Sequence, residues 1–249
     1  MVLDLHRITH VTFDCYGTLI DWETGILHAL QPVLVRHGVT ASDEELLRLF
    51  VKLEAEEEIG HYKSYRDVLS SVMACIGTAL HFKPSPGELG KLADSMKDWR
   101  PFPDTIAALR ILKRRFQIAI ISNVDDVLFA STARRLQVSW NSVTTAQLAR
   151  SYKPARRNFR CALTRLGVQP ADVLHVAQSL YHDHVPAQAL GISTVWVKRP
   201  SRLGVTGLAL PVDIRPNLEV PDLQTLADIA VSGARHPRKN SSKRSAVGQ

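Results

Sequence analysis

Five short runs of apolar and β-branched residues predict buried β-strands. They are His10–Asp14, Gln117–Ser122, Ser142–Thr145, Val173–Ala177 and Ser193–Lys198. Within these runs the apolar positions are largely continuous and do not alternate with polar ones. This pattern is typical of parallel strands that helices cover on both faces of the sheet.

Helical patterns separate the later strands. Thr105–Arg115 places its apolar residues on one face, and the helices predicted over Arg156–Leu166 and Pro186–Leu190 each end before a glycine, a residue that commonly terminates helices. Alternating strands and helices indicate βαβ units. We therefore predict an α/β fold with a Rossmann-like, doubly wound parallel sheet.

The segment between the first and second predicted strands breaks this alternation. It spans roughly 100 residues and has mainly helical patterns, the clearest over Glu44–Glu58 and Tyr65–Leu80. An insertion here follows the carboxyl end of a strand, where ligands bind in such sheets. We expect residues 1–20 and 100–232 to form the catalytic core and residues 21–99 to form a helical cap.

The positive charge of the chain is concentrated at its end. Of 249 residues, 31 are Lys or Arg and 24 are Asp or Glu, which gives a formal net charge of +7. Residues 233–249 contain five of the positive residues and no acidic one, so the rest of the chain has a net charge of only +2. We expect a solvated, disordered basic tail and no specific nucleic-acid partner.

Composition also bears on cellular location. No apolar run approaches the roughly 18 residues that a membrane span requires, so we expect no membrane partner. Three widely spaced cysteines without a CxxC pair argue against a disulfide framework. The first residues lack the features of a signal peptide. These patterns favour a cytoplasmic protein. They do not specify the oligomeric state, and a homodimer is compatible with them.

Polar residues follow four of the predicted strands at their carboxyl ends. In chain order these are Asp14 and Thr18, Ser122 and Asn123, Lys153, and finally Gln178 and Asp183. Each group alone has an ordinary explanation, such as a turn, an exposed loop lysine or a helix cap. The carboxyl ends of parallel strands share one edge of the sheet, however, so together the groups predict a single site.

The order Asp, Ser, Lys, Asp resembles the haloacid dehalogenase superfamily, over roughly residues 9–200 and with the cap inserted after the first motif. That motif is Asp-x-x-Gly-Thr, and the string FDCYGTLIDW is similar to the 2-haloacid dehalogenase-like branch. The resemblance implies that Asp14 is a nucleophile that forms an ester with the substrate. It implies that Lys153 keeps Asp14 ionised and that Asp183 orients Lys153 or directs the hydrolytic water. Thr18 and Ser122, with Asn123 close by, would position the carboxylate or the substrate.

Two positions depart from the phosphatases of this superfamily. Tyr16 stands where they carry a second Asp as general acid, and Gln178 replaces an acidic residue that helps to hold Mg²⁺. An alkoxide leaving group needs a proton and a phosphate dianion needs charge neutralisation, whereas a halide leaves without a proton. The two replacements therefore favour carbon–halogen hydrolysis, and we assign Tyr16 and Gln178 to the substrate-binding surface.

Other positions depart from the 2-haloacid dehalogenases. Phe159 replaces their Tyr six residues after the Lys, and neither Arg48 nor Arg66 aligns with the cap Arg that receives the halide. Trp22, Tyr62 and Tyr65 could line an apolar pocket or belong to the core.

We expect an enzyme that hydrolyses a small anionic substrate, a 2-haloacid, without a metal or other cofactor. The alternatives are a Mg²⁺-dependent phosphatase of small molecules and a non-catalytic binding protein on the same scaffold.

Overall fold

The computed structural model describes residues 3–202 and 212–233. Its centre is a six-stranded sheet with the order β3-β2-β1-β4-β5-β6, in which every neighbouring pair is parallel. The strands are β1 (His10–Phe13), β2 (Gln117–Ser122), β3 (Ser142–Thr145), β4 (Val173–Ala177), β5 (Ser193–Val197) and β6 (Leu218–Val220). The chain begins in the middle of the sheet, winds to one edge and returns to the other. The predicted doubly wound α/β fold is confirmed.

The predicted strands agree with the observed ones to within a residue. β1 ends at Phe13, so Asp14 is the first residue beyond it, and β5 ends at Val197. The sixth strand, β6, was not predicted because its three residues are too few to show a pattern.

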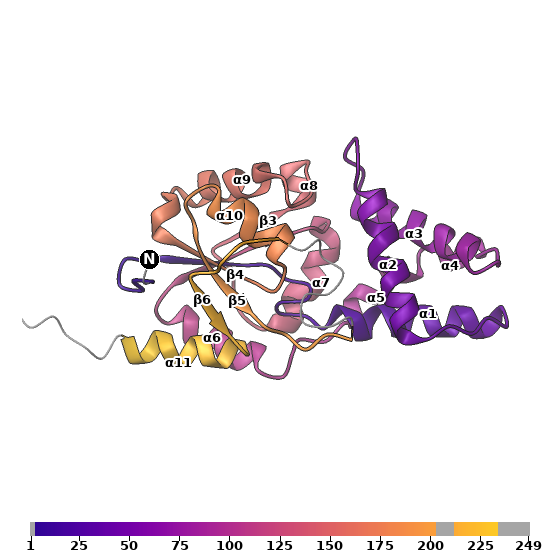
Figure 1. Ribbon diagram of the computed structural model, residues 1–249, viewed down its shortest axis with the longest axis horizontal. Coiled ribbons are helices and arrows are strands. Elements are labelled where there is room, and N and C mark those ends of the chain that lie inside the picture. Colours follow the sequence, from indigo (N-terminus) through magenta and orange to yellow (C-terminus); the bar gives the residue numbers. More distant parts are fainter. Residues whose placement is uncertain (1–2, 203–211, 234–249) are drawn as a thin grey trace, which may run out of the picture.

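Helices cover both faces of this sheet (Figure 1). α6 (Thr105–Lys113) and α11 (Leu223–Gly233) lie side by side on one face. α9 (Arg156–Leu166) and α10 (Val185–Gln188) lie on the other. α7 (Asp126–Leu136) and the short α8 (Ala146–Ala149) follow β2 and β3. With both faces covered, the strands have the continuous apolar runs that the sequence shows.

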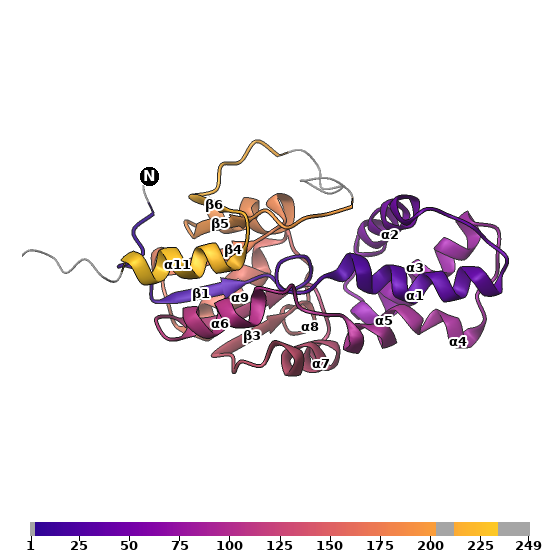
Figure 2. The same ribbon diagram turned by 90° about the horizontal axis from the view of Figure 1, so that it is seen from below.

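The chain between β1 and β2 forms a separate group of helices, here called the helical lobe (Figures 1 and 2). It contains α1 (Trp22–Arg36), α2 (Asp43–Glu57), α3 (Tyr65–Ala79), α4 (Pro86–Leu89), α5 (Lys91–Ser95) and a 3₁₀ turn (Met96–Asp98). Ser42 and Glu45 form a capping box that begins α2, and Ser64 caps α3. The lobe projects from the carboxyl end of β1, so it lies next to the residues that follow the strands.

One apolar core joins the sheet to the lobe. It includes Val11 and Phe13 of β1, Ile20 of the connection, and Leu30 and Met73 of the lobe, all fully buried. Burial of such side chains contributes about 1.5–3 kcal/mol each. This shared core fixes the lobe over the strand ends.

None of the helices within residues 3–202 and 212–233 is long and apolar enough to cross a membrane. Residues 234–249, which hold the basic tail, lie outside the described residues.

Candidate active site

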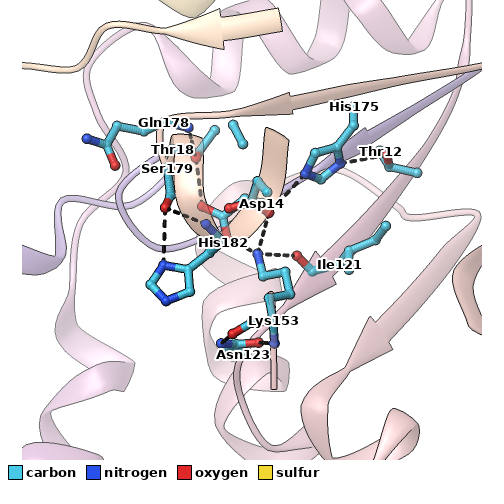
Figure 3. A network of polar contacts seen from close by, with 12 residues as sticks. Thr12, Asp14, Thr18, Ile121, Asn123, Lys153, His175, Gln178, Ser179 and His182 are labelled. Atoms are coloured by element: carbon cyan, nitrogen blue, oxygen red, sulfur yellow. Dashed lines mark hydrogen bonds and ion pairs between the residues drawn. The ribbon is translucent and has the colours of Figure 1, made fainter. Parts of the chain in front are cut away.

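The loop after β1 holds Asp14 against Thr18 (Figure 3). Thr18 Oγ1 donates a hydrogen bond of 2.7 Å to Asp14 Oδ2 and accepts one of 2.9 Å from the Gln178 backbone N–H. Gly17 has a φ of +93°, a conformation that side chains other than glycine's disfavour. The reversal at Gly17 therefore returns the Thr18 hydroxyl to the carboxylate four residues before it.

Lys153 joins the strand ends at the centre of the site. Its Nζ donates to Asp14 Oδ1 at 2.8 Å, to Asp183 Oδ1 at 2.7 Å and to the Ile121 carbonyl at 3.1 Å. An ammonium has three protons, so all three are used. Asn123 fixes the lysine backbone, because its Oδ1 accepts from the Lys153 N–H at 2.7 Å and its Nδ2 donates to the Lys153 carbonyl at 3.2 Å.

A histidine that the sequence analysis did not single out completes this network. His175 of β4 is fully buried, with Nε2 3.0 Å from Asp183 Oδ1 and Nδ1 2.8 Å from Thr12 Oγ1. A neutral ring satisfies both contacts when Nε2 donates to the carboxylate and Nδ1 accepts from the hydroxyl. In the sequence, the feature that could have indicated its role is a histidine within an otherwise apolar predicted strand, eight residues before Asp183.

The charges of the network follow from its burial and contacts. Burial acts to lower the pKa of Lys153, but the two carboxylates outweigh it and raise that pKa above its ordinary value. Burial acts to raise the pKa of Asp183, yet Lys153 and His175 lower it below its usual range. Burial raises the pKa of Asp14, with Lys153 in partial opposition. Asp14 is thus the carboxyl group that takes up a proton more readily, and Lys153 and Asp183 form an ion pair.

The donor set is a poor fit for Mg²⁺. The Lys153 ammonium already contacts both Asp14 and Asp183, and it would repel a cation placed between them. Gln178, which also lines the pocket, adds a neutral amide and no further negative charge. Within the described residues no group of three or more His, Cys, Asp or Glu is arranged to hold a metal ion. Mg²⁺ requires near-octahedral oxygen coordination, which these side chains do not supply.

A pocket of about 650 Å³ lies between the strand ends and the helical lobe. All the predicted site residues line it except Thr18, which is fully buried behind Asp14. Ser122 Oγ is buried in the wall and has no hydrogen-bond partner. Tyr16 also lines the pocket, but its hydroxyl lies 2.9 Å from Thr132 Oγ1, and burial raises its pKa well above the ordinary value.

The lobe supplies an aromatic wall. Trp22 and Tyr65 line the pocket together with Phe50 and Trp99, whereas Tyr62 is not among the lining residues and stacks on Tyr152. Arg48 and Arg66 are not among the lining residues. They form ion pairs elsewhere on the lobe, with Glu44 at 2.7 Å and Asp94 at 2.8 Å respectively.

Asp125, in the loop after β2, connects the core to the lobe. Its carboxylate accepts hydrogen bonds of 2.9 Å from the backbone N–H groups of Tyr65 and Arg66, the first residues of α3. The Tyr62 hydroxyl donates to it at 3.4 Å. A residue of the core thus caps a helix of the lobe, and this long-range contact has no local sequence signal.

Comparisons with known proteins agree with this geometry. A family model described as haloacid dehalogenase-like hydrolase matches residues 11–197. (S)-2-haloacid dehalogenase 4A from Burkholderia cepacia is 27% identical over 195 residues, which cover 75% of this chain and 81% of the relative. The (S)-2-haloacid dehalogenase from Xanthobacter autotrophicus is 28% identical over 205 residues, or 78% of this chain and 77% of the relative.

A solved structure extends the comparison to the fold. It is the L-2-haloacid dehalogenase from Xanthobacter autotrophicus with chloropropionic acid covalently bound, with a TM-score of 0.76 and 22% identity. The match covers 90% of this chain and 98% of that one. The fold, the site geometry and the family model lead to one conclusion: the chain belongs to the haloacid dehalogenase-like hydrolases.

Proposed function

We propose that the protein cleaves the carbon–halogen bond of a 2-haloacid by hydrolysis, with Asp14 as the nucleophile and without a metal ion. The observation that supports this best is the position of the Lys153 ammonium, 2.8 Å from Asp14 and 2.7 Å from Asp183. It supplies the positive charge that a metal supplies in other hydrolases. The relatives named as 2-haloacid dehalogenases support the choice of leaving group.

In the first step a carboxylate oxygen of Asp14 attacks the carbon that carries the halogen. A carbon–oxygen bond forms, the carbon–halogen bond breaks, and the halide leaves with the electron pair. No proton is needed, so Tyr16, with its hydroxyl beside Thr132, is tolerated where a general acid would otherwise be required. The Ser122 hydroxyl, for which the described residues provide no hydrogen-bond partner, would donate to the carboxylate of the substrate.

In the second step water attacks the carboxyl carbon of the Asp14 ester. The bond from that carbon to the ester oxygen breaks, and the product leaves as a 2-hydroxy acid that keeps this oxygen. Lys153 stabilises the negative charge that develops on the other oxygen. Asp183, held by His175, keeps the ammonium directed at Asp14. Overall, one water and one haloacid give a hydroxy acid, a halide ion and a proton.

The covalent route has a direct test. When enzyme in excess turns over 2-chloropropionate once in ¹⁸O-water, we expect the label in the peptide that contains Asp14 and not in the product. Halide release should be unchanged by EDTA. Phosphate release from phosphate esters that depends on Mg²⁺, without halide release from haloacids, would show that the phosphatase alternative is correct.

A further inference from the structure

Two carboxyl groups of the lobe face the pocket opposite the strand ends. Glu54 and Glu58 lie four residues apart, at the end of α2, and both line the pocket. Tyr65 donates its hydroxyl proton to Glu54 Oε1, and Asn123 Nδ2 lies 3.4 Å from Glu58 Oε2. The second oxygen of each carboxyl group accepts no hydrogen bond from the described residues.

Among the described residues no cation forms an ion pair with either glutamate, although the Lys153 charge acts on Glu58 from a distance. Of the two cations that line the described pocket, Lys153 is bound to Asp14 and Asp183, and Arg199 forms a bidentate ion pair with Asp104 at 2.7 and 2.9 Å. Burial lowers the pKa of His182 to about 4, so this histidine is neutral at pH 7.

The unbalanced pair is electrostatically costly. Burial raises the pKa of Glu54 to about 7, although the hydrogen bond from Tyr65 acts in the opposite direction. Burial and the neighbouring Glu54 raise the pKa of Glu58 well above its ordinary value, with Lys153 in partial opposition. A raised pKa means that the neutral form of each carboxyl group is favoured in the empty pocket, and a cation that enters between them stabilises both ionised forms.

We propose that Glu54 and Glu58 bind a positively charged amino group of the substrate. A metal ion is a weaker candidate because no third ligand stands beside the pair in the described chain. The aromatic rings of Trp22 and Phe50, which also line the pocket, suit an ammonium group through cation–π contacts.

The side chains on the two sides of the pocket, Ser122 on the core and the two glutamates on the lobe, indicate the class of substrate. Ser122 Oγ, buried and unpartnered on the core side, provides a second polar contact that a ligand completes. The volume of 650 Å³ is in the range of roughly 300–1,000 Å³ for pockets that hold larger organic ligands. The inference rests on the proposed function and extends it: the substrate is a 2-haloacid that also carries an amino group at its far end.

The test uses two unreactive probes of equal length, 6-aminohexanoate and heptanoate, which differ in a terminal ammonium or methyl group. We expect the wild-type enzyme to bind 6-aminohexanoate at least about tenfold more tightly in calorimetry at pH 8, the gain of one charge-assisted hydrogen bond. The double variant Glu54→Gln/Glu58→Gln should lose this preference. Glu56→Gln, an exposed change on the same helix, is the matched control and should keep it.

The outcomes separate this inference from the proposed function. Equal affinities, tighter binding of heptanoate, or an unchanged preference in the folded double variant would overturn it. Binding of Mg²⁺ that requires Glu54 and Glu58 would overturn it as well, since it would make the pair a metal site. Halide release from 2-chloropropionate and from 6-amino-2-chlorohexanoate is measured in parallel. Release without an amine preference refutes only the amine site, and an amine preference without halide release from either compound refutes the dehalogenase function.

Discussion

Replacement of Lys153 by methionine tests how much the lysine charge contributes to stability. Methionine fills the volume of the lysine stem with little strain but removes the ammonium. Asp14 and Asp183, only 7% and 1% exposed, are then left facing each other without a cation. Removal of one partner from a buried ion pair costs about 3–5 kcal/mol, because the remaining charge is uncompensated. We expect Lys153→Met to lower the free energy of unfolding by about this amount.

The pH dependence of this loss has a defined sign. In the wild type, the pKa of Asp183 is below its usual range, so its stabilising contribution is present at neutral pH and disappears as the pH falls through that pKa. In the variant both carboxyl pKa values lie above those of the unfolded chain. The variant therefore gains stability as the pH falls, and the gap between the two proteins should narrow from pH 7.5 to pH 5.

Urea unfolding, followed by circular dichroism and tryptophan fluorescence, measures this difference. Coincident transitions are needed, because the lobe and the sheet must unfold together for one free energy to apply. In thermal melts the same loss corresponds to a decrease in Tm of roughly 6–20 °C. A variant within about 1 kcal/mol of wild type at pH 7.5, or a gap that widens toward pH 5, would refute the ion-pair assignment.

Four further results are expected. Asp14→Asn should abolish turnover but leave Tm unchanged or higher, because Lys153 then balances one carboxylate; rapid turnover would exclude Asp14 as nucleophile. Asp125→Ala should cost about 1–3 kcal/mol in urea unfolding and speed hydrogen exchange at the Tyr65 and Arg66 amides, whose acceptor it removes. EDTA should leave halide release unchanged; loss of activity, restored by Mg²⁺, would contradict this. Deletion of residues 235–249 should change neither Tm nor activity, and a large drop in Tm would show that the tail packs on the body.

The strand ends of the site were predictable because two regular patterns combine there. Continuous apolar runs marked the strands, and in a parallel sheet their carboxyl ends share one edge. That alignment predicted one shared site, and the resemblance to the haloacid dehalogenase superfamily predicted that Lys153 acts on Asp14 and Asp183, from which 139 and 30 residues separate it. No knowledge of side-chain conformation was required for this part of the prediction.

Contacts that depend on tertiary packing were not predictable in the same way. His175 occupies a strand position that any apolar residue could fill, and only the three-dimensional structure shows Asp183 and Thr12 at its two nitrogens. Asp125 resembles an ordinary loop residue before a helix. Its partners are in α3, some 60 residues earlier, and their approach depends on the packing of the whole lobe.

The pocket is formed by two parts of the chain, the strand ends of the core and the helices of the lobe. The groups that carry the proposed chemistry come from strand ends, whose relative positions are fixed by backbone hydrogen bonds of the sheet. The groups that face them, Glu54 and Glu58, come from α2, which packs against α3, the helix whose first N–H groups Asp125 holds. Asn123 contacts both Glu58 and the backbone of Lys153, so a substitution of Glu54 should change the charge of the pocket with less effect on Lys153 than a substitution of Glu58. If the amine site that we propose is correct, part of the substrate preference comes from the lobe, and relatives with the same strand-end residues need not share a substrate.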